Sequence, residues 1–196
     1  GVPGMKGLVS AVKDCLIAAN VDRAHFVGHS MGALICQYLA ADAPGLVSGM
    51  TLFGPLLEPP AAARQALKER AQTARNGGLT DIADSIFRGS VSEGQRVASA
   101  FVRESILRQD PNGYASHCEA LSEAAAAAHQ RITVPTLLIA GETDPVAPLA
   151  MVRQLQQDIS LAQLEIVPQV AHWIMVEAPE RSTQLLRAHL DTCHHK

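Results

Sequence analysis

One serine of the sequence lies in a pattern suited to nucleophilic catalysis. Residues 28–32 read Gly-His-Ser-Met-Gly, with Ser30 at the centre. A short apolar run precedes this pattern and a segment with helical spacing follows it, which predicts a sharp turn between a strand and a helix. The flanking glycines, Gly28 and Gly32, would let neighbouring backbone pass without a Cβ clash. The turn would expose the Ser30 hydroxyl at the end of the strand, although a turn serine before a helix is the alternative interpretation.

A nucleophilic serine needs a base, and His172 is the histidine best placed for that role. It follows a predicted strand over residues 163–167, in a loop that reads Ala-His-Trp. A loop histidine can lie between the serine and an acid, whereas a surface-loop histidine with no role is the alternative. His29 lies inside the serine pattern and is expected to line the site. The other histidines lie in a predicted strand, in predicted helices or in the C-terminal tail: His25, His117, His129, His189, His194 and His195.

The acid that would orient the histidine is Asp144. It belongs to Gly-Glu-Thr-Asp-Pro at residues 141–145, directly after a predicted strand over residues 134–140. An acid beyond the carboxyl end of a parallel strand can point into the crevice where catalytic loops meet. Glu142 is the rival carboxylate. We prefer Asp144 because it lies further from the strand, within the loop.

The elements that must position these residues alternate between strand and helix, which predicts a parallel sheet. Helical patterns dominate from residue 58 to residue 131 and indicate about four helices there. This change of pattern divides the chain into a core part over residues 1–54, a helical cap over 55–131 and a second core part over 132–196. The other predicted elements are helices over residues 5–19, 31–41, 149–157 and 179–190, and strands over 24–28 and 47–53.

Composition excludes several classes of protein. Hydrophobic residues make up 47% and charged residues 18%, as in an ordinary globular domain. The net charge is −3 with scattered basic residues, so a nucleic-acid partner is not expected. Apolar runs are far shorter than the roughly 20 residues that span a bilayer, and the N-terminus does not have the pattern of a signal peptide. A cytoplasmic protein with free thiols and without a membrane segment is therefore expected, and the scattered cysteines predict no metal site: Cys15, Cys36, Cys118 and Cys193.

Three segments, GHSMG, VPTLLIAGETDPVAP and AHWIMVEAPE, resemble the α/β-hydrolase family. LFGPL and FVRESILRQDPNGYASHCEAL are similar to the branch that contains 3-oxoadipate enol-lactonases. The resemblance implies an α/β-hydrolase fold, with a mostly parallel sheet, helices on both faces and an inserted helical cap. It implies that Ser30 attacks an ester or lactone carbonyl while His172 takes the proton and Asp144 holds the imidazole. An acyl-enzyme would form and be hydrolysed without metal or organic cofactor.

The same resemblance places the oxyanion and substrate-binding positions at His29, Met31 and Trp173. The Met31 N–H, directly after the nucleophile, would be one oxyanion donor, and the second normally comes from a loop near the family's N-terminus. Family members normally begin about 70 to 80 residues earlier, and four predicted strands are few for such a sheet. We therefore expect an N-terminally truncated fold. A bare edge on the Ser30 strand would then favour aggregation or the formation of homo-oligomers.

The sequence leaves three functions open. An ester or lactone hydrolase is favoured by three residue types in the expected order and context. Cofactor-free haloperoxidase chemistry at the same site and a non-catalytic ligand-binding protein are the alternatives. Arg103 and Arg108 in the helical part are candidates to face a substrate carboxylate, although helix arginines are usually solvated.

Overall fold

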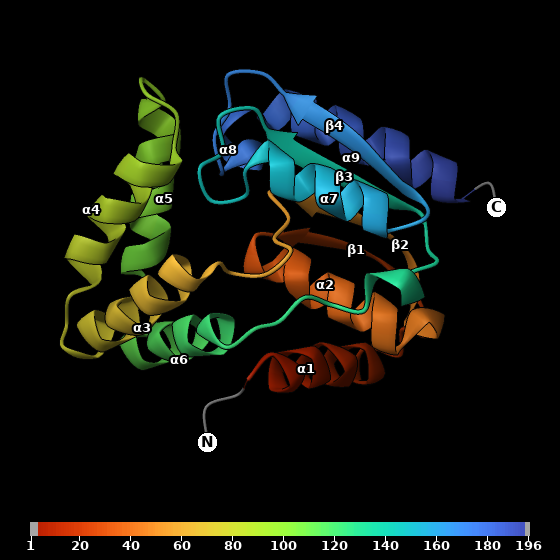
Figure 1. Ribbon diagram of the computed structural model, residues 1–196, viewed down its shortest axis with the longest axis horizontal. Helices are drawn as coiled ribbons and strands as arrows, with labels where there is room; N and C mark the ends of the chain where they lie inside the picture. The colour runs from red at the N-terminus through yellow and green to blue at the C-terminus, as the bar shows by residue number, and fades with distance from the viewer. Residues whose placement is uncertain (1–3, 195–196) are drawn as a thin grey trace.

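The computed structural model describes residues 4–194 and has a parallel sheet at its centre (Figure 1). Within these residues the sheet has four strands in the order β1-β2-β3-β4, and every neighbouring pair is parallel. The prediction of a parallel sheet is therefore confirmed, with strand ends within two residues of the predicted ones. The strands are β1 (Ala24–His29), β2 (Val47–Phe53), β3 (Thr136–Gly141) and β4 (Ala162–Val167).

Helices cover both faces of the sheet, as predicted. On one face, α2 packs on β1 and β2, α7 packs on β3 and β4, and α1 packs outside α2. On the other face, α8 contacts β3 and α9 contacts β2. Successive residues of β3 serve the two faces, because Leu138 belongs to the first apolar core and Ile139 to the second. The helices are α1 (Met5–Ala18), α2 (Met31–Asp42), α7 (Leu149–Asp158), α8 (Ile174–Glu177) and α9 (Pro179–His194), and a 3₁₀ turn, η1 (Pro44–Leu46), precedes β2.

Four further helices follow β2 and precede β3 along the chain, and they lie beside the carboxyl ends of the strands (Figure 1). They share an apolar core of their own, in which α3 packs on α6 and α4 packs on α5. Trp173 packs against this core from the other part of the chain. We call α3–α6 the helical segment: α3 (Ala61–Arg75), α4 (Leu79–Ser90), α5 (Arg96–Leu107) and α6 (Pro111–Ser122), followed by the 3₁₀ turn η2 (His129–Arg131).

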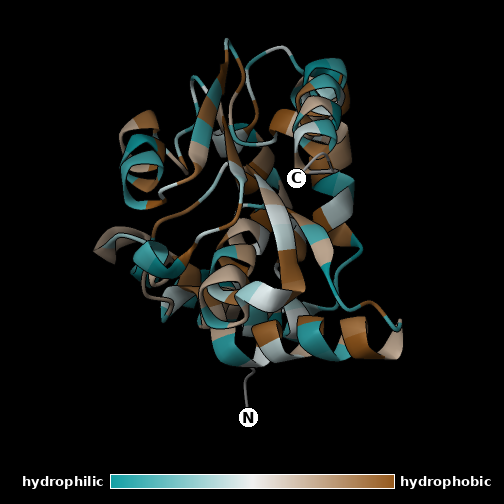
Figure 2. Cartoon of the chain, turned by 90° about the vertical axis from the view of Figure 1, so that its right-hand side faces the viewer, coloured by the Kyte–Doolittle hydropathy of each residue, from teal (hydrophilic) through white to brown (hydrophobic). Residues whose placement is uncertain are grey.

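Strand β1 forms one edge of the sheet, since among residues 4–194 it pairs only with β2. Val27 on this strand is 51% exposed. Association of copies through the edge stays a prediction. None of the helices in the described part of the chain is long and apolar enough to cross a membrane. Figure 2 shows hydrophilic and hydrophobic residues interleaved along these helices.

Candidate active site

Ser30 lies in a strained turn between β1 and α2. Its backbone has φ 53° and ψ −117°, a left-handed conformation that side chains other than glycine rarely adopt. The Ser30 N–H donates to the Phe53 carbonyl at 3.0 Å, which anchors the turn to β2. Strain of this kind is common where a side chain must be presented to a reaction, and here it presents the Ser30 hydroxyl.

The two glycines of the serine pattern differ in what they do. A Cβ on Gly28 would lie 2.6 Å from the Gly32 carbonyl oxygen, so only glycine fits at position 28. A Cβ on Gly32 would meet nothing within 4 Å. The expectation that both glycines prevent a clash is therefore right for Gly28 and wrong for Gly32. Gly32 supplies the backbone that Gly28 approaches, while its own Cβ position faces open space.

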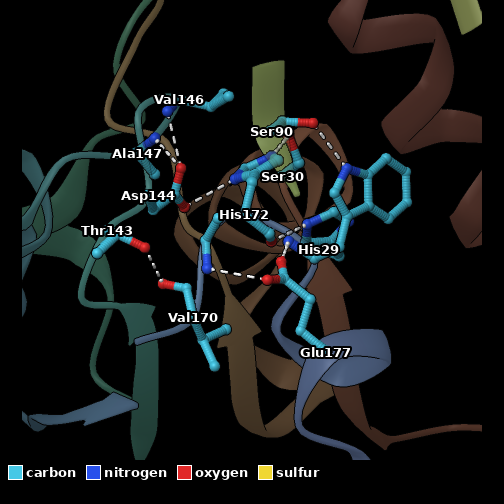
Figure 3. A network of polar contacts seen from close by, with 12 residues as sticks. His29, Ser30, Ser90, Thr143, Asp144, Val146, Ala147, Val170, His172 and Glu177 are labelled. Carbon is cyan, nitrogen blue, oxygen red and sulfur yellow. Dashed lines mark hydrogen bonds and ion pairs between the residues drawn. The ribbon is translucent and has the colours of Figure 1, made fainter. Parts of the chain in front are cut away.

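The structure brings the three predicted catalytic residues into one hydrogen-bonded row (Figure 3). His172 Nε2 lies 2.9 Å from Ser30 Oγ, and His172 Nδ1 lies 2.7 Å from Asp144 Oδ2. If Nδ1–H donates to the carboxylate, Nε2 carries the lone pair that accepts the serine proton. His172 and Asp144 are both 5% exposed, so this row lies largely outside bulk water. The arrangement can activate a hydroxyl as a nucleophile.

Asp144 is held in its charged form. Its Oδ1 accepts hydrogen bonds from the N–H groups of Val146 at 2.7 Å and Ala147 at 3.0 Å. Burial alone would raise the pKa of Asp144, but the hydrogen bond and charge of His172 and these two N–H groups outweigh burial and lower the pKa. Glu142, the rival acid, lies apart: its Oε2 accepts from the Gln169 N–H at 2.9 Å.

Gly54, directly after β2, lies against the His172–Asp144 pair. Its φ is 48°, and a Cβ there would lie 2.9 Å from His172 Nδ1 and 3.3 Å from Asp144 Oδ2. Any larger residue would collide with the pair. The sequence feature that could have identified Gly54 is its position directly after a predicted strand, at the same end of the sheet as Ser30 and Asp144.

The rings of His29 and Trp173 pack beside His172, at 4.6 Å between the His29 and His172 centroids and 4.9 Å between those of His29 and Trp173. His29 Nε2 lies 2.9 Å from the His172 carbonyl oxygen, to which Nε2–H can donate. Burial and the neighbouring His172 lower the pKa of His29 to about 4, so the ring is neutral at neutral pH. The Trp173 indole N–H donates to Ser90 Oγ at 2.9 Å. The described contacts of both rings position the His172 loop, and a role in binding substrate stays a prediction.

Glu177 is a buried residue of the site that sequence reasoning missed. One carboxylate oxygen accepts from the N–H groups of Ser92 at 2.9 Å and Ala171 at 3.2 Å, and the other accepts from Trp173 N–H at 3.1 Å. Residues on both sides of His172 are thereby fixed to one side chain (Figure 3). The helical segment adds a further bond, since the His172 N–H donates to the Ser90 carbonyl at 3.0 Å. The only sequence signal was an acid four residues after Trp173.

Met31 is the first residue of α2, directly after Ser30. N–H groups in the first turn of a helix have no acceptor within the helix, and they carry the positive end of its dipole. The Met31 N–H therefore suits the predicted role of oxyanion donor beside the Ser30 hydroxyl.

The two arginines considered for a substrate carboxylate are paired with acids of the helical segment. Arg103 Nε lies 2.6 Å from Asp84 Oδ1, and Arg108 Nε lies 2.9 Å from Glu104 Oε1. The Arg108 side chain is 76% exposed. The structure gives both residues surface ion pairs and brings neither to the Ser30 row through a described contact.

Comparison with known proteins agrees with this geometry. The family model for the alpha/beta hydrolase fold matches residues 9–179. The 3-oxoadipate enol-lactonase 2 of Acinetobacter baylyi is 32% identical over 179 residues, which cover 86% of this chain and 64% of that protein. The (E)-2-((N-methylformamido)methylene)succinate hydrolase of the same organism is 27% identical, covering 91% and 69%.

The solved structure of the enol-lactonase from Burkholderia xenovorans superposes with a TM-score of 0.90 at 27% identity, covering 97% of this chain and 74% of that one. The family model matches most of the sequence, and the similarity to enol-lactonases agrees with the branch expected from LFGPL and the FVRESILRQDPNGYASHCEAL segment. The chain therefore belongs to the α/β-hydrolase family.

Proposed function

We propose that this chain is a serine hydrolase that cleaves a carboxylic ester or lactone of a small molecule through an acyl-enzyme. The observation that carries the proposal is the row from Ser30 Oγ through His172 to Asp144, with distances of 2.9 and 2.7 Å. The names of the relatives, two of them enol-lactonases, support the ester or lactone as the bond that is cleaved.

In the first half of the reaction, Ser30 Oγ attacks the carbonyl carbon while its proton moves to His172 Nε2. Asp144 accepts from Nδ1–H throughout, which fixes the tautomer and stabilises the imidazolium that forms. The oxyanion of the tetrahedral intermediate is stabilised by the Met31 N–H and the positive end of α2. Collapse of the intermediate breaks the ester bond, and the proton passes from Nε2 to the leaving alcohol oxygen.

In the second half, water replaces the alcohol. His172 Nε2 takes a proton from the water, whose oxygen attacks the acyl carbon. The second tetrahedral intermediate collapses, the proton returns to Ser30 Oγ, and the carboxylic acid is released. A lactone gives a single product, because its alcohol and acid remain joined.

We propose that residues 55–131, which include the helical segment, form a cap over this site. Two contacts support this: Trp173, next to His172, packs against the helical core, and Ser90 at the end of α4 binds the His172 loop. A cap in this place would exclude water from the Ser30 row and shape the space for the substrate.

A fluorophosphonate probe tests the nucleophile directly, because it reacts with activated serines. We expect one labelled peptide, carrying the label on Ser30, and no labelling of Ser30→Ala. Ser10→Ala, a matched change at an exposed serine of α1, should label like the original chain. Labelling of a different serine, or equal labelling of Ser30→Ala, would refute the assignment.

Kinetics with p-nitrophenyl acetate test the acyl-enzyme. We expect a burst of nitrophenol in stoichiometric proportion to the enzyme, because acylation precedes a slower hydrolysis. A non-catalytic binder would show no burst. Peroxide-dependent halogenation in the absence of ester hydrolysis would instead indicate the haloperoxidase alternative.

A further inference from the structure

A second group of chemically reactive side chains lies at the opposite end of the sheet. His25 is at the beginning of β1, and His189 and Cys193 are on the last turns of α9. One ligand atom of each residue lies within 4.8 Å of those of the other two. His25 precedes Ser30 by five residues, which along a strand amounts to roughly 16 Å. The group is therefore separate from the proposed hydrolase site.

The helix brings two of the three residues to one face. His189 and Cys193 are four residues apart, a spacing that places side chains next to one another on a helix. His189 Nε2 lies 3.8 Å from Cys193 Sγ. The His25 ring approaches His189 edge to face, with centroids 5.3 Å apart.

Gly49 on β2 makes room for the group. A Cβ at this position would lie 2.9 Å from His25 Nδ1 and 3.0 Å from Cys193 Sγ. Any other residue would therefore push the strand histidine and the helix thiol out of this space. The two potential ligand atoms share the space that the missing side chain leaves.

The surroundings orient the His25 imidazole. His25 Nε2 lies 2.9 Å from Oγ1 of the fully buried Thr51, and a bond donated by Nε2–H leaves the Nδ1 lone pair on the side of Gly49. Metal-binding histidines are commonly oriented in this way through their second nitrogen.

We propose that His25, His189 and Cys193 bind a zinc ion that ties the end of α9 to β1 and β2. Two imidazole nitrogens and one thiolate are ligands that zinc prefers, and a water molecule would complete a tetrahedron. Tetrahedral zinc with these ligands separates its donor atoms by roughly 3.3–3.6 Å. The His189–Cys193 distance of 3.8 Å is close to this value, and Cys193 is partly exposed, so its side chain has room to adjust and the ion has a path from solvent.

Cobalt and zinc titrations of the full chain test the proposal. The chain is made without a histidine tag and with His194→Ala and His195→Ala, so that the histidines of the tail do not bind metal themselves. We expect Co²⁺ to produce the near-ultraviolet charge-transfer band of a thiolate ligand and the visible bands of tetrahedral geometry, and Zn²⁺ to abolish both at one equivalent. A spectrum without a thiolate band would overturn the proposal, and this readout needs no further substitution.

Ligand variants identify the residues. Cys193→Ser should weaken zinc binding by at least about a hundredfold and remove the thiolate band. Even mutation of a residue that only hydrogen-bonds to a metal ligand lowers metal affinity by about 10- to 100-fold. Cys15→Ser, the same change at an exposed cysteine of α1, should leave both unchanged. His25→Gln should weaken zinc binding while far-ultraviolet circular dichroism shows a folded chain. Equal zinc affinity in the Cys193→Ser and Cys15→Ser chains would refute the site.

Discussion

Each end of the sheet has a histidine beside a hydroxyl or a thiol, but the two ends hold these side chains differently. At the carboxyl end, the His172 loop is fixed by backbone bonds to Ser90 and Glu177, and the ring has partners at 2.9 and 2.7 Å. At the amino end, the ligand atoms of His25, His189 and Cys193 lie within 4.8 Å of one another, and the hydrogen-bond contact described for the Cys193 thiol is with His189 Nε2 at the longer distance of 3.8 Å. The comparison separates a site organised for reaction, in which geometry is held beforehand, from one that a bound ion would have to draw together.

The largest effect is expected from the acid of the carboxyl-end site. Asp144→Asn preserves the shape but favours the wrong His172 tautomer, and turnover of p-nitrophenyl acetate should fall by about 10⁴, as in serine proteases. Glu142→Gln is the matched control, because the described hydrogen bond of the Glu142 side chain is with the nearby Gln169 N–H. A greater loss in Glu142→Gln than in Asp144→Asn would show that the wrong carboxylate was assigned.

Glu177→Gln tests whether the frame around His172 matters for the reaction. The amide can accept with only one of its two ends, so at least one N–H of Ser92, Ala171 or Trp173 loses its acceptor at a cost of about 1–3 kcal/mol. We expect kcat to fall by about 10- to 100-fold with little change in KM. Glu180→Gln, at an exposed position in the first turn of α9, should have the full kcat. Equal values for both variants would contradict a positioning role.

His29 should make stability depend on pH. Its pKa is about 4 in the folded chain against an ordinary 6.5, so the unfolded chain binds more protons between these values. The free energy of unfolding should therefore fall as pH drops from 6.5 to 4. In His29→Gln that fall should be smaller by on the order of 1–3 kcal/mol, measured by urea unfolding. His129 and His189, whose pKa values are also lowered by burial, are present in both chains and cancel in the difference. Identical pH profiles would count against the buried, neutral ring.

The open edge of β1 connects the two ends of the sheet, and we expect a substitution on this edge to change the oligomeric state. Val27→Lys places a charge on the exposed edge, which opposes pairing with another copy, and sedimentation should shift toward the monomer. Val97→Lys introduces the same charge at a position on α5 that is 83% exposed and should leave sedimentation unchanged. A chain that is already monomeric at all concentrations would contradict association through this edge.

The smallest effect should come from the amino end. Cys193→Ser and His189→Gln should keep ester hydrolysis within about twofold of the original, because sites this far apart without shared partners act independently. Hydrolysis at 25 °C under saturating substrate is the measurement. A large loss in a folded variant would show that the two ends of the sheet are coupled and do not act as separate sites.

The order of strands along the chain made the row of Ser30, His172 and Asp144 predictable from the sequence. Ser30, Asp144 and His172 each come after a strand. Because the carboxyl ends of parallel strands lie at the same end of the sheet, the order of elements alone predicted that the three residues meet. Gly54 has the same placement and was missed only because its backbone conformation does not show in residue type.

Contacts between elements far apart in the sequence could not be predicted from the order of strands and helices. Ser90 and Glu177 reach the His172 loop from the end of α4 and from α8, and their pairing depends on how the helical segment packs. The cluster of His25, His189 and Cys193 forms only because α9 crosses back over the beginning of β1 and β2. The cysteine spacing alone therefore predicted no metal site. Gly32 is an error of the opposite kind: the Gly-x-Ser-x-Gly pattern predicted that a side chain would clash at this position, but a Cβ there would meet nothing within 4 Å.

The bonds from Ser90 to the His172 loop set a rule for protein engineering. Ser90 is the last residue of α4, yet its carbonyl receives the His172 N–H and its hydroxyl receives the Trp173 indole. Exchanging the helical segment between relatives to change their substrate range would remove both acceptors together with the helices. Chimeras that keep residues 90–92 of the recipient would retain these two bonds and the hydrogen bond from the Ser92 N–H to Glu177, so His172 would keep the contacts that position its loop.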